Sequence, residues 1–220
     1  MSALRDLLGV AHEDLRVIPV VVVDSPGAAR PLAAALADGG LPCAEVTLRT
    51  PAALEALHEM AGEPGMLVGA GSVVSPSQVD QAVDAGARFV VSPGLSEAVL
   101  ARCRVLGVPA LPGVATAGEI MRAVELGVDV VKLFPAAQLG GPAGVRSLAA
   151  PFPSVRFVPT GGIGPGNLAA YLALDAVAGV GGSWMVSPEL VRLGRFDEVR
   201  RLTRSAVTIA RQLGRAGRPA

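Results

Sequence analysis

The sequence predicts an α/β fold in which eight strand–helix units close into a single (β/α)8 TIM barrel. Short β-branched runs alternate with Ala- and Leu-rich stretches at nearly even spacing along 220 residues, a length typical of one barrel domain. Gly86, Gly107 and Gly127 stand where helices are expected to end, and Thr116 with Glu119 forms a capping-box pattern at a helix start. An open, doubly wound sheet is the alternative fold, because a strand count made from sequence is uncertain.

The expected elements cover nearly the whole chain. The expected strands are residues 17–23, 44–49, 66–70, 89–92, 110–111, 130–133, 156–159 and 176–179. The expected helices are residues 27–37, 51–61, 76–84, 97–106, 117–126, 141–149, 166–173 and 196–213. Residues 2–11 are expected to form an extra N-terminal helix. Residues 1–213 then form one domain, and the Gly-, Arg- and Pro-containing residues 214–220 form a flexible tail.

Composition argues against several classes of function. Nineteen basic and 19 acidic residues give a net charge of zero, so the chain offers no basic field for nucleic acid. No apolar run reaches the length needed to cross a membrane, and the N-terminus lacks the order of a signal peptide, so we expect a cytoplasmic protein. Cys43 and Cys103 lie in apolar settings and are expected to be buried free thiols. His12 and His58 have no partners at ligand spacing, so no metal site is expected.

Lys132 is the only lysine of the chain, since the other 18 basic residues are arginines. It lies in the apolar run 128–135, which has the pattern of a buried strand. A desolvated lysine amine can lose its proton and attack a ketone, whereas a guanidinium stays protonated. Lys132 is therefore a candidate Schiff-base lysine. The alternative is a structural lysine paired with a buried carboxylate.

The expected strand 44–49 carries charged side chains on one face. Glu45, Thr47 and Arg49 alternate with apolar residues, so the apolar face is expected to meet the helices and the polar face to point into the barrel. Buried charges are costly unless they are paired or serve a site. Lys132 and Phe134 share one face of the sixth strand, so the barrel could hold Lys132, Glu45 and Arg49 together. The alternative is an ion-pair network that only supports the barrel.

Glycine pairs follow the last two strands. Gly161-Gly162 and Gly181-Gly182 would allow backbone N–H groups to approach a phosphate closely, with a following helix N-terminus adding positive potential. Phosphate sites of barrels commonly lie at these two positions. Ser72 offers a hydroxyl near the same opening, although a turn or a helix cap would explain it equally well.

Six strings in this order resemble one family over nearly the whole chain. They are Glu45-Val46-Thr47-Leu48-Arg49-Thr50, Gly69-Ala70-Gly71-Ser72-Val73, Ser92-Pro93-Gly94, Lys132-Leu133-Phe134-Pro135-Ala136, Pro159-Thr160-Gly161-Gly162-Ile163 and Gly181-Gly182-Ser183-Trp184. Together they closely resemble the bacterial 2-dehydro-3-deoxy-phosphogluconate (KDPG) aldolase family, which is also named 4-hydroxy-2-oxoglutarate aldolase.

The resemblance implies a role for each matching residue. Lys132 matches the Schiff-base lysine, Glu45 the general acid and base, and Arg49 the residue that holds the substrate carboxylate. Phe134 and Pro93 match the lining of the pyruvyl pocket. The far end of the substrate, with its phosphate, matches Thr160, Gly161, Gly162, Gly181, Gly182 and Ser183.

The resemblance also implies a metal-free class I enzyme without a cofactor, and a homotrimer that acts on a small phosphorylated 2-keto acid. Ser72 departs from the family pattern, which commonly has threonine there, but it keeps the hydroxyl. The C4-epimeric phosphogalactonate compound is an alternative substrate. A phosphosugar isomerase or epimerase, and a phosphosugar-binding domain without catalysis, are alternatives from other classes.

Overall fold

The computed structural model describes residues 16–216, with side chains as far as Leu213. The expected N-terminal helix at 2–11 and residues 217–220 lie outside this part. The strands of the described part are β1 (Val17–Val21), β2 (Cys43–Thr47), β3 (Leu67–Gly71), β4 (Phe89–Val91), β5 (Ala110–Leu111), β6 (Gly113–Val114), β7 (Val130–Leu133), β8 (Arg156–Pro159) and β9 (Val180–Gly182).

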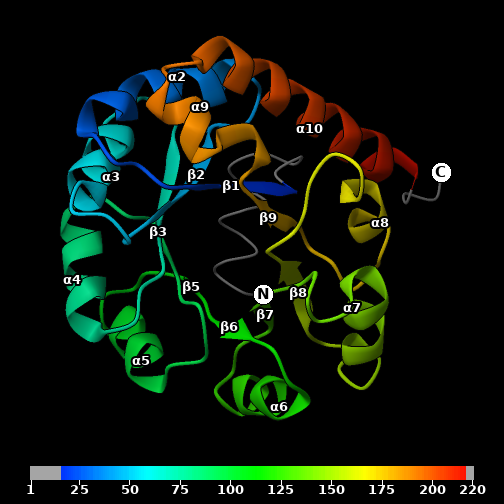
Figure 1. Cartoon of the computed structure of the whole chain (residues 1–220). Coiled ribbons are helices and arrows are strands. Elements are labelled where there is room, and N and C mark those ends of the chain that lie inside the picture. The colour runs from blue at the N-terminus through cyan, green and yellow to red at the C-terminus, as the bar shows by residue number, and fades with distance from the viewer. Residues whose placement is uncertain (1–15, 217–220) are drawn as a thin grey trace.

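Helices surround these strands as an outer ring (Figure 1). They are η1 (Pro26–Ala28), α2 (Ala29–Asp38), α3 (Ala53–Ala61), α4 (Pro76–Asp84), α5 (Glu97–Val105), α6 (Ala117–Glu125), α7 (Gly141–Ala149), α8 (Leu168–Leu172), η2 (Trp184–Val186), α9 (Pro188–Arg192) and α10 (Phe196–Ala216). Most expected boundaries agree with these within two residues. Helix α9 was not expected, and α10 continues three residues beyond the expected end at 213.

The predicted closed barrel of eight strands is wrong. The strands form a six-stranded sheet in the order β5-β4-β3-β2-β1-β9 and a separate three-stranded sheet in the order β6-β7-β8. Every strand pair within both sheets is parallel, so the α/β class is correct. Between β8 and β9 the ladder is reduced to an isolated bridge from Thr160 to Gly181.

Pro112 explains one of the two breaks. It lies between β5 and β6, where the sequence predicted a single strand at 110–111. Proline has no N–H to donate, so it interrupts a ladder. The carbonyl of Pro112 still accepts a hydrogen bond from the backbone of Lys132 at 2.9 Å. The chain therefore passes from one sheet to the other at this residue.

The last strand lies later than predicted. Residues 176–179 contribute only a bridge from Val177 to Phe157, and β9 begins at Val180. Glycine is a poor strand former, which is why Gly181 and Gly182 were expected in a loop. They pair in register with Ile18 and Pro19 of β1 instead. Tertiary pairing therefore outweighs the local preference here.

The expected helix ends are confirmed. Gly86, Gly107 and Gly127 adopt positive φ at helix ends, a conformation that glycine adopts without a steric penalty. The Thr116 hydroxyl accepts from the backbone N–H of Glu119, whose carboxylate accepts from the backbone N–H of Thr116. These caps fix the lengths of the helices and hence the places where the chain enters each strand.

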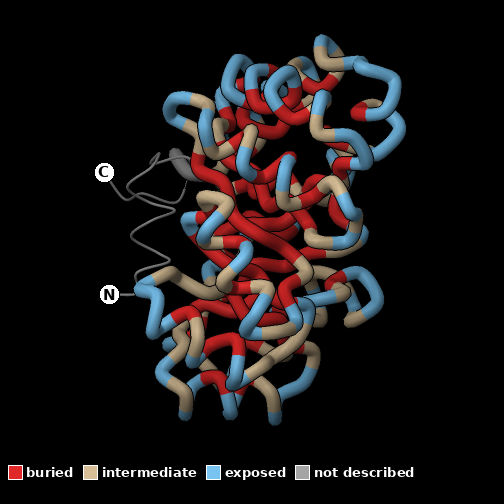
Figure 2. The backbone as a smooth tube through the Cα atoms, turned by 90° about the vertical axis from the view of Figure 1, so that its left-hand side faces the viewer, coloured by how far each residue is buried: buried red, intermediate tan, exposed pale blue. Residues whose placement is uncertain are grey.

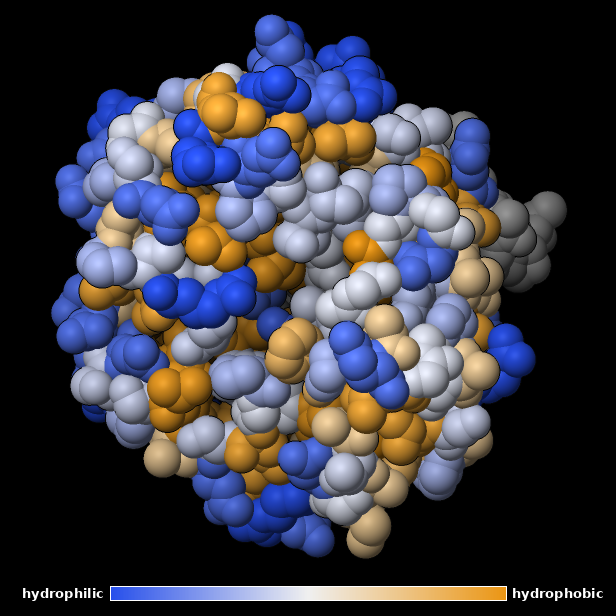
Figure 3. Space-filling model, viewed as in Figure 1, coloured by the Kyte–Doolittle hydropathy of each residue, from blue (hydrophilic) through white to orange (hydrophobic). Residues whose placement is uncertain are grey.

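Burial is highest along the strands and on the helix faces that cover them (Figure 2). Small and medium side chains dominate this core, since Val and Ala are its most frequent residues and aromatics make up only 3% of the chain. The outer rim carries mainly hydrophilic side chains (Figure 3). Within the described residues, no helix is both long and apolar enough to cross a membrane.

Candidate active site

Lys132 lies in the middle of the three-stranded sheet. It is on β7, paired in register with Gly113 of β6 on one side and with Val158 of β8 on the other. Only 7% of its side chain is exposed. The sequence prediction of a buried strand lysine is therefore confirmed.

Glu45 reaches the same place from the other sheet. It is on β2, and its side chain is 2% exposed. Lys132 Nζ donates a hydrogen bond to Glu45 Oε1 at 3.1 Å, so this ion pair connects the two sheets. Burying two charges carries a large desolvation cost, which close pairing offsets only in part. Such a pair is better suited to chemistry than to stability, because each group can take a proton from the other.

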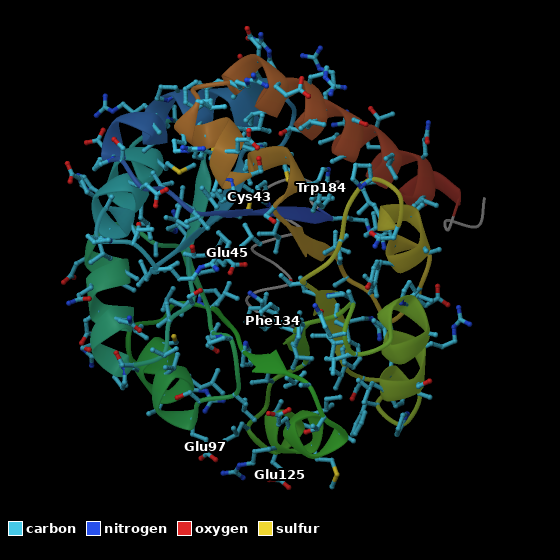
Figure 4. The ribbon with its side chains drawn as sticks, viewed as in Figure 1. Cys43, Glu45, Glu97, Glu125, Phe134 and Trp184 are labelled. Atoms are coloured by element: carbon cyan, nitrogen blue, oxygen red, sulfur yellow. The ribbon has the colours of Figure 1, made fainter. Side chains whose placement is uncertain are left out.

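The partly exposed ring of Phe134 lies beside the Lys132 amine. Lys132 Nζ lies 5.4 Å from the centre of the Phe134 ring, a cation–π distance. The ring is on the first residue after β7, and the residue is 38% exposed. Glu45 and Phe134 both lie inside the ring of helices, whereas Glu97 and Glu125 lie on its outer rim (Figure 4). The Phe134 ring therefore covers the Lys132 amine on one side.

The two thiols do not compete with Lys132 as nucleophiles. Cys43 and Cys103 are free and buried, as expected. Burial, with the nearby negative charge of Glu45, raises the pKa of Cys43 to about 12. Burial also raises the pKa of Cys103 to about 11. Both stay protonated at neutral pH, and the thiolate is the reactive form.

Arg49 does not share the buried face of β2. The strand ends at Thr47, whose hydroxyl donates to the carbonyl of Val21 at 2.9 Å, and residues 48–50 form a turn. Arg49 is exposed in this turn, whereas Glu45 and Thr47 are buried as expected. Among the described residues, its guanidinium makes no ion pair or side-chain hydrogen bond. It remains available to an incoming anion at the C-terminal end of β2.

Pro93 and Ser72 lie at the ends of the neighbouring strands. A Cβ on Gly113 would overlap the Pro93 carbonyl, so Pro93 approaches closely the residue that pairs with Lys132. Pro93 itself is exposed and Ser72 is half-buried. Ser72 is the only described residue other than glycine with a positive φ, at 59°. This left-handed conformation costs free energy in a non-glycine residue and is often found at functional sites.

The first glycine pair forms a tight turn after β8. Gly161 and Gly162 have φ of 98° and 75°, which other residues adopt only with strain. A Cβ on Gly161 would contact the Phe134 ring at 3.4 Å, so the turn begins beside the pocket wall. Thr160, just before it, is buried and donates weakly to the Val158 carbonyl at 3.4 Å. The turn therefore lies beside the Phe134 ring, which in turn lies over the Lys132 amine.

The second glycine pair differs from the first. Gly181 and Gly182 are buried parts of β9, and a Cβ on Gly181 would overlap the Thr160 hydroxyl. A Cβ on Gly182 would overlap the Trp184 ring. Ser183 follows at the exposed start of η2. Gly181 and Gly182 therefore allow close packing against Thr160 and Trp184, whereas Ser183 is exposed.

Asn167 was not predicted, and it fastens the first glycine turn. Its amide Nδ2 donates to the carbonyl of Gly162, and its Oδ1 accepts from the N–H of Gly164, both at 2.9 Å. Asparagine commonly bonds to nearby backbone in turns, so the run Gly164-Pro165-Gly166-Asn167 carried a signal for such a clamp. The clamp holds the turn in one conformation.

No group of three or more His, Cys, Asp or Glu side chains with metal-binding geometry occurs among the described residues. The site itself brings together one amine, Lys132, and one carboxylate, Glu45.

The chain is similar to known aldolases over most of its length. A family model described as KDPG and KHG aldolase matches residues 10–202. The 2-dehydro-3-deoxy-phosphogluconate aldolase of Treponema pallidum is 49% identical over 90% of this chain and 95% of its own. The KHG/KDPG aldolase of Escherichia coli K12 is 43% identical over 87% and 90%.

Solved structures agree. The KDPG aldolase of Legionella pneumophila, crystallised with pyruvate captured as a covalent carbinolamine intermediate, superposes with a TM-score of 0.84. It is 41% identical and covers 87% of this chain and 93% of its own. The resemblance inferred from the motifs is thereby confirmed, and the chain belongs to the KDPG and KHG aldolase family.

Proposed function

We propose that the chain is a class I aldolase that cleaves 2-dehydro-3-deoxy-6-phosphogluconate to pyruvate and glyceraldehyde 3-phosphate. The single observation that carries this proposal is the burial of the only lysine of the chain against a buried carboxylate, 3.1 Å away. Family membership supports it, because the relatives are named as aldolases, which are lyases. An isomerase or a binding domain would use this lysine without forming a covalent adduct, so trapping of an adduct distinguishes these alternatives.

Covalent attachment is the first step. Glu45 takes a proton from the Lys132 ammonium, and the free amine attacks the C2 carbonyl of the substrate. Glu45 then returns a proton, directly or through a water molecule, to the hydroxyl of the carbinolamine. Water leaves, and an iminium joins C2 to Nζ. Phe134 keeps bulk water from this bond on one side.

Carbon–carbon cleavage follows because the iminium accepts electrons. Glu45 removes the proton of the C4 hydroxyl, and the C3–C4 bond breaks as its electrons move into the iminium. Glyceraldehyde 3-phosphate leaves, and an enamine of pyruvate remains on Lys132. Protonation of C3 and hydrolysis of the imine release pyruvate and restore the amine.

The remaining site residues bind the substrate. Arg49, free at the C-terminal end of β2, pairs with the carboxylate, best through two parallel hydrogen bonds. Pro93 and Phe134 enclose the pyruvyl part, and Ser72 offers a hydroxyl at the opening. The phosphate end is bound by the segments that follow β8 and β9: Thr160, Gly161, Gly162, Gly181, Gly182 and Ser183.

Backbone N–H groups, rather than a long helix dipole, bind the phosphate in this proposal. The helices after the two glycine pairs are α8, of five residues, and η2, of three. Helices this short have small dipoles. The exposed turn at Gly161-Gly162 is preorganised instead by Asn167.

4-Hydroxy-2-oxoglutarate is a second substrate in this proposal, cleaved to pyruvate and glyoxylate. The matching family model and the Escherichia coli relative carry both activities in their names. A solved structure described as native KDPGal is 28% identical to this chain, whereas the 2-keto-3-deoxy-6-phosphogluconate aldolase of Zymomonas mobilis ZM4 is 40% identical. This difference favours the gluconate epimer. We also propose a homotrimer, following the family resemblance, and a cytoplasmic location, which suits two free thiols.

Borohydride trapping tests the covalent step. With pyruvate and borohydride, the chain is expected to gain one reduced pyruvyl group, which peptide mass spectrometry places on Lys132. No other side-chain amine exists, so only the N-terminal amine can compete. Chelators are expected to leave activity intact. An adduct confined to Met1, or no adduct, contradicts the proposal, and chelator inhibition reversed by a divalent metal would indicate a metal-dependent aldolase.

Asn167→Ala tests the phosphate end. Loss of both side-chain hydrogen bonds frees the Gly162 turn, so its N–H groups must be ordered on binding. We expect KM for the phosphorylated substrate to rise about tenfold, the effect of one or two hydrogen bonds. Steady-state kinetics on 4-hydroxy-2-oxoglutarate provide the control, because that substrate has no phosphate and should change little. Equal rises in KM for both substrates would show that the turn shapes the whole substrate site rather than the phosphate end alone.

A further inference from the structure

The Glu45 side chain lies over a glycine of the neighbouring strand. In the parallel register of β2 and β3, Glu45 pairs with Gly69, and Thr47 pairs with Gly71. The Glu45 side chain nevertheless leans forward over Gly71. A Cβ on Gly71 would lie 2.7 Å from Glu45 Cγ and 2.9 Å from Cδ, and it would overlap Oε1. The whole carboxyl arm therefore occupies the space that a side chain on Gly71 would fill.

This lean directs the carboxylate toward the reacting amine. Side chains of a strand lean along its direction, and here the direction is toward the C-terminal end, where Arg49 and Ser72 lie. Among the described residues, the Glu45 carboxylate accepts a hydrogen bond from Lys132 Nζ. The carboxylate therefore contacts the Lys132 amine and also lies against the backbone of Gly71.

We infer that Gly71 is a positioning residue, which sets the place of the Glu45 carboxylate for proton transfer. This inference rests on the proposed function, because it assigns the proton transfers to Glu45. Gly71 does not need to be glycine for its backbone, since its φ is not positive. Its lack of a side chain leaves room for the Glu45 carboxyl group.

The substitution Gly71→Ala displaces Glu45 by most of an ångström, because ordinary contacts of a Cβ begin near 3.4 Å. A misplacement of about 1 Å can slow an enzyme about 10²-fold. The readout is exchange of the methyl protons of pyruvate in D2O, followed by NMR. This exchange needs both the imine and the proton shuttle. Borohydride trapping, which reports the imine alone, is expected to persist in Gly71→Ala.

The same strand offers a matched control. Gly69 also has no positive φ, and a Cβ there would overlap the ring of Phe89, a core residue of β4, rather than a reacting group. Gly69→Ala is expected to lower the melting temperature but to keep the exchange rate per folded enzyme near the wild-type value. Gly71→Ala is expected to lower that rate about 10²-fold.

A double-mutant cycle identifies Glu45 as the mediator. If Gly71 acts through Glu45, then Gly71→Ala in a Glu45→Gln background changes the residual exchange rate by no more than about twofold. A further 10²-fold loss in that background, or wild-type exchange in Gly71→Ala, overturns the inference. So do equal losses in Gly69→Ala and Gly71→Ala.

Failure of Gly71→Ala to fold is also decisive, through Gly71→Ala in a background that lacks the ion pair, Glu45→Ala/Lys132→Met. Alanine has none of the Glu45 atoms that the new methyl group would overlap, and no buried charge is left unpaired, so this triple variant is expected to fold. If it does not, the glycine serves the fold rather than Glu45, and the inference is overturned. Wild-type enzyme that neither traps nor exchanges pyruvate would contradict the proposed function, which separates that failure from failure of the inference.

Discussion

Lys132→Arg is expected to abolish aldol cleavage while the chain still folds. The guanidinium retains the positive charge that faces Glu45, so no buried carboxylate is left unpaired. It cannot form an imine, because it stays protonated and its nitrogens are delocalised. Removal of a covalent nucleophile commonly costs on the order of 10⁴-fold or more in kcat. Release of pyruvate, measured with a coupled dehydrogenase, should therefore fall to background.

Lys132→Arg is also a control for the borohydride trapping experiment. Lys132→Arg has no side-chain amine, so pyruvate and borohydride should leave it unlabelled except at the N-terminus. Lys132→Arg/Arg201→Lys restores one lysine, but on the exposed face of α10, where Arg201 forms an ion pair with Glu198. This variant should remain inactive. Circular dichroism and the melting temperature establish that each variant is folded, and turnover by folded Lys132→Arg contradicts the Schiff-base mechanism.

The pairing of Lys132 with Glu45 could be predicted from the sequence because each is a charged residue in a strand that is expected to be buried. A lysine within an apolar strand and a glutamate that is the only charged residue of β2 both require a partner when buried. Strand periodicity places each side chain on an inward face, and the structure brings them to 3.1 Å across 87 residues of sequence. The same argument does not place Arg49, because strand periodicity holds only while the strand lasts, and β2 ends at Thr47.

The arrangement of the sheets depended on pairings that a local pattern does not contain. Pro112, which lacks an N–H, separates β5, which pairs with β4, from β6, which pairs with β7. Gly181 and Gly182 belong to β9 because β1 lies beside them and Thr160 needs the space, although glycine predicts a loop. The role of Gly71 was hidden for the same reason, since only the fold places Glu45 over it.

Glu45→Gln is expected to separate attachment from turnover. Glutamine has the shape of glutamate, so it still lies over Gly71 and still accepts a hydrogen bond from Lys132. It cannot take up or release a proton in the relevant range. Imine formation should continue slowly, because solvent can supply those protons. Cleavage needs a base at the C4 hydroxyl, so kcat should fall by about 10²–10⁴-fold, the usual contribution of general acid–base catalysis.

Two measurements on Glu45→Gln distinguish this role from a structural one. Borohydride trapping with pyruvate should still label Lys132, whereas exchange of the pyruvate methyl protons in D2O should fall with kcat. A purely structural glutamate predicts the opposite balance, because replacing it leaves a buried lysine without a counter-charge and lowers the melting temperature more than the rate per folded enzyme. If Glu45→Gln keeps near-normal kcat, the proton shuttle lies on another residue. The buried pair would then serve only to hold Lys132 in place between the two sheets.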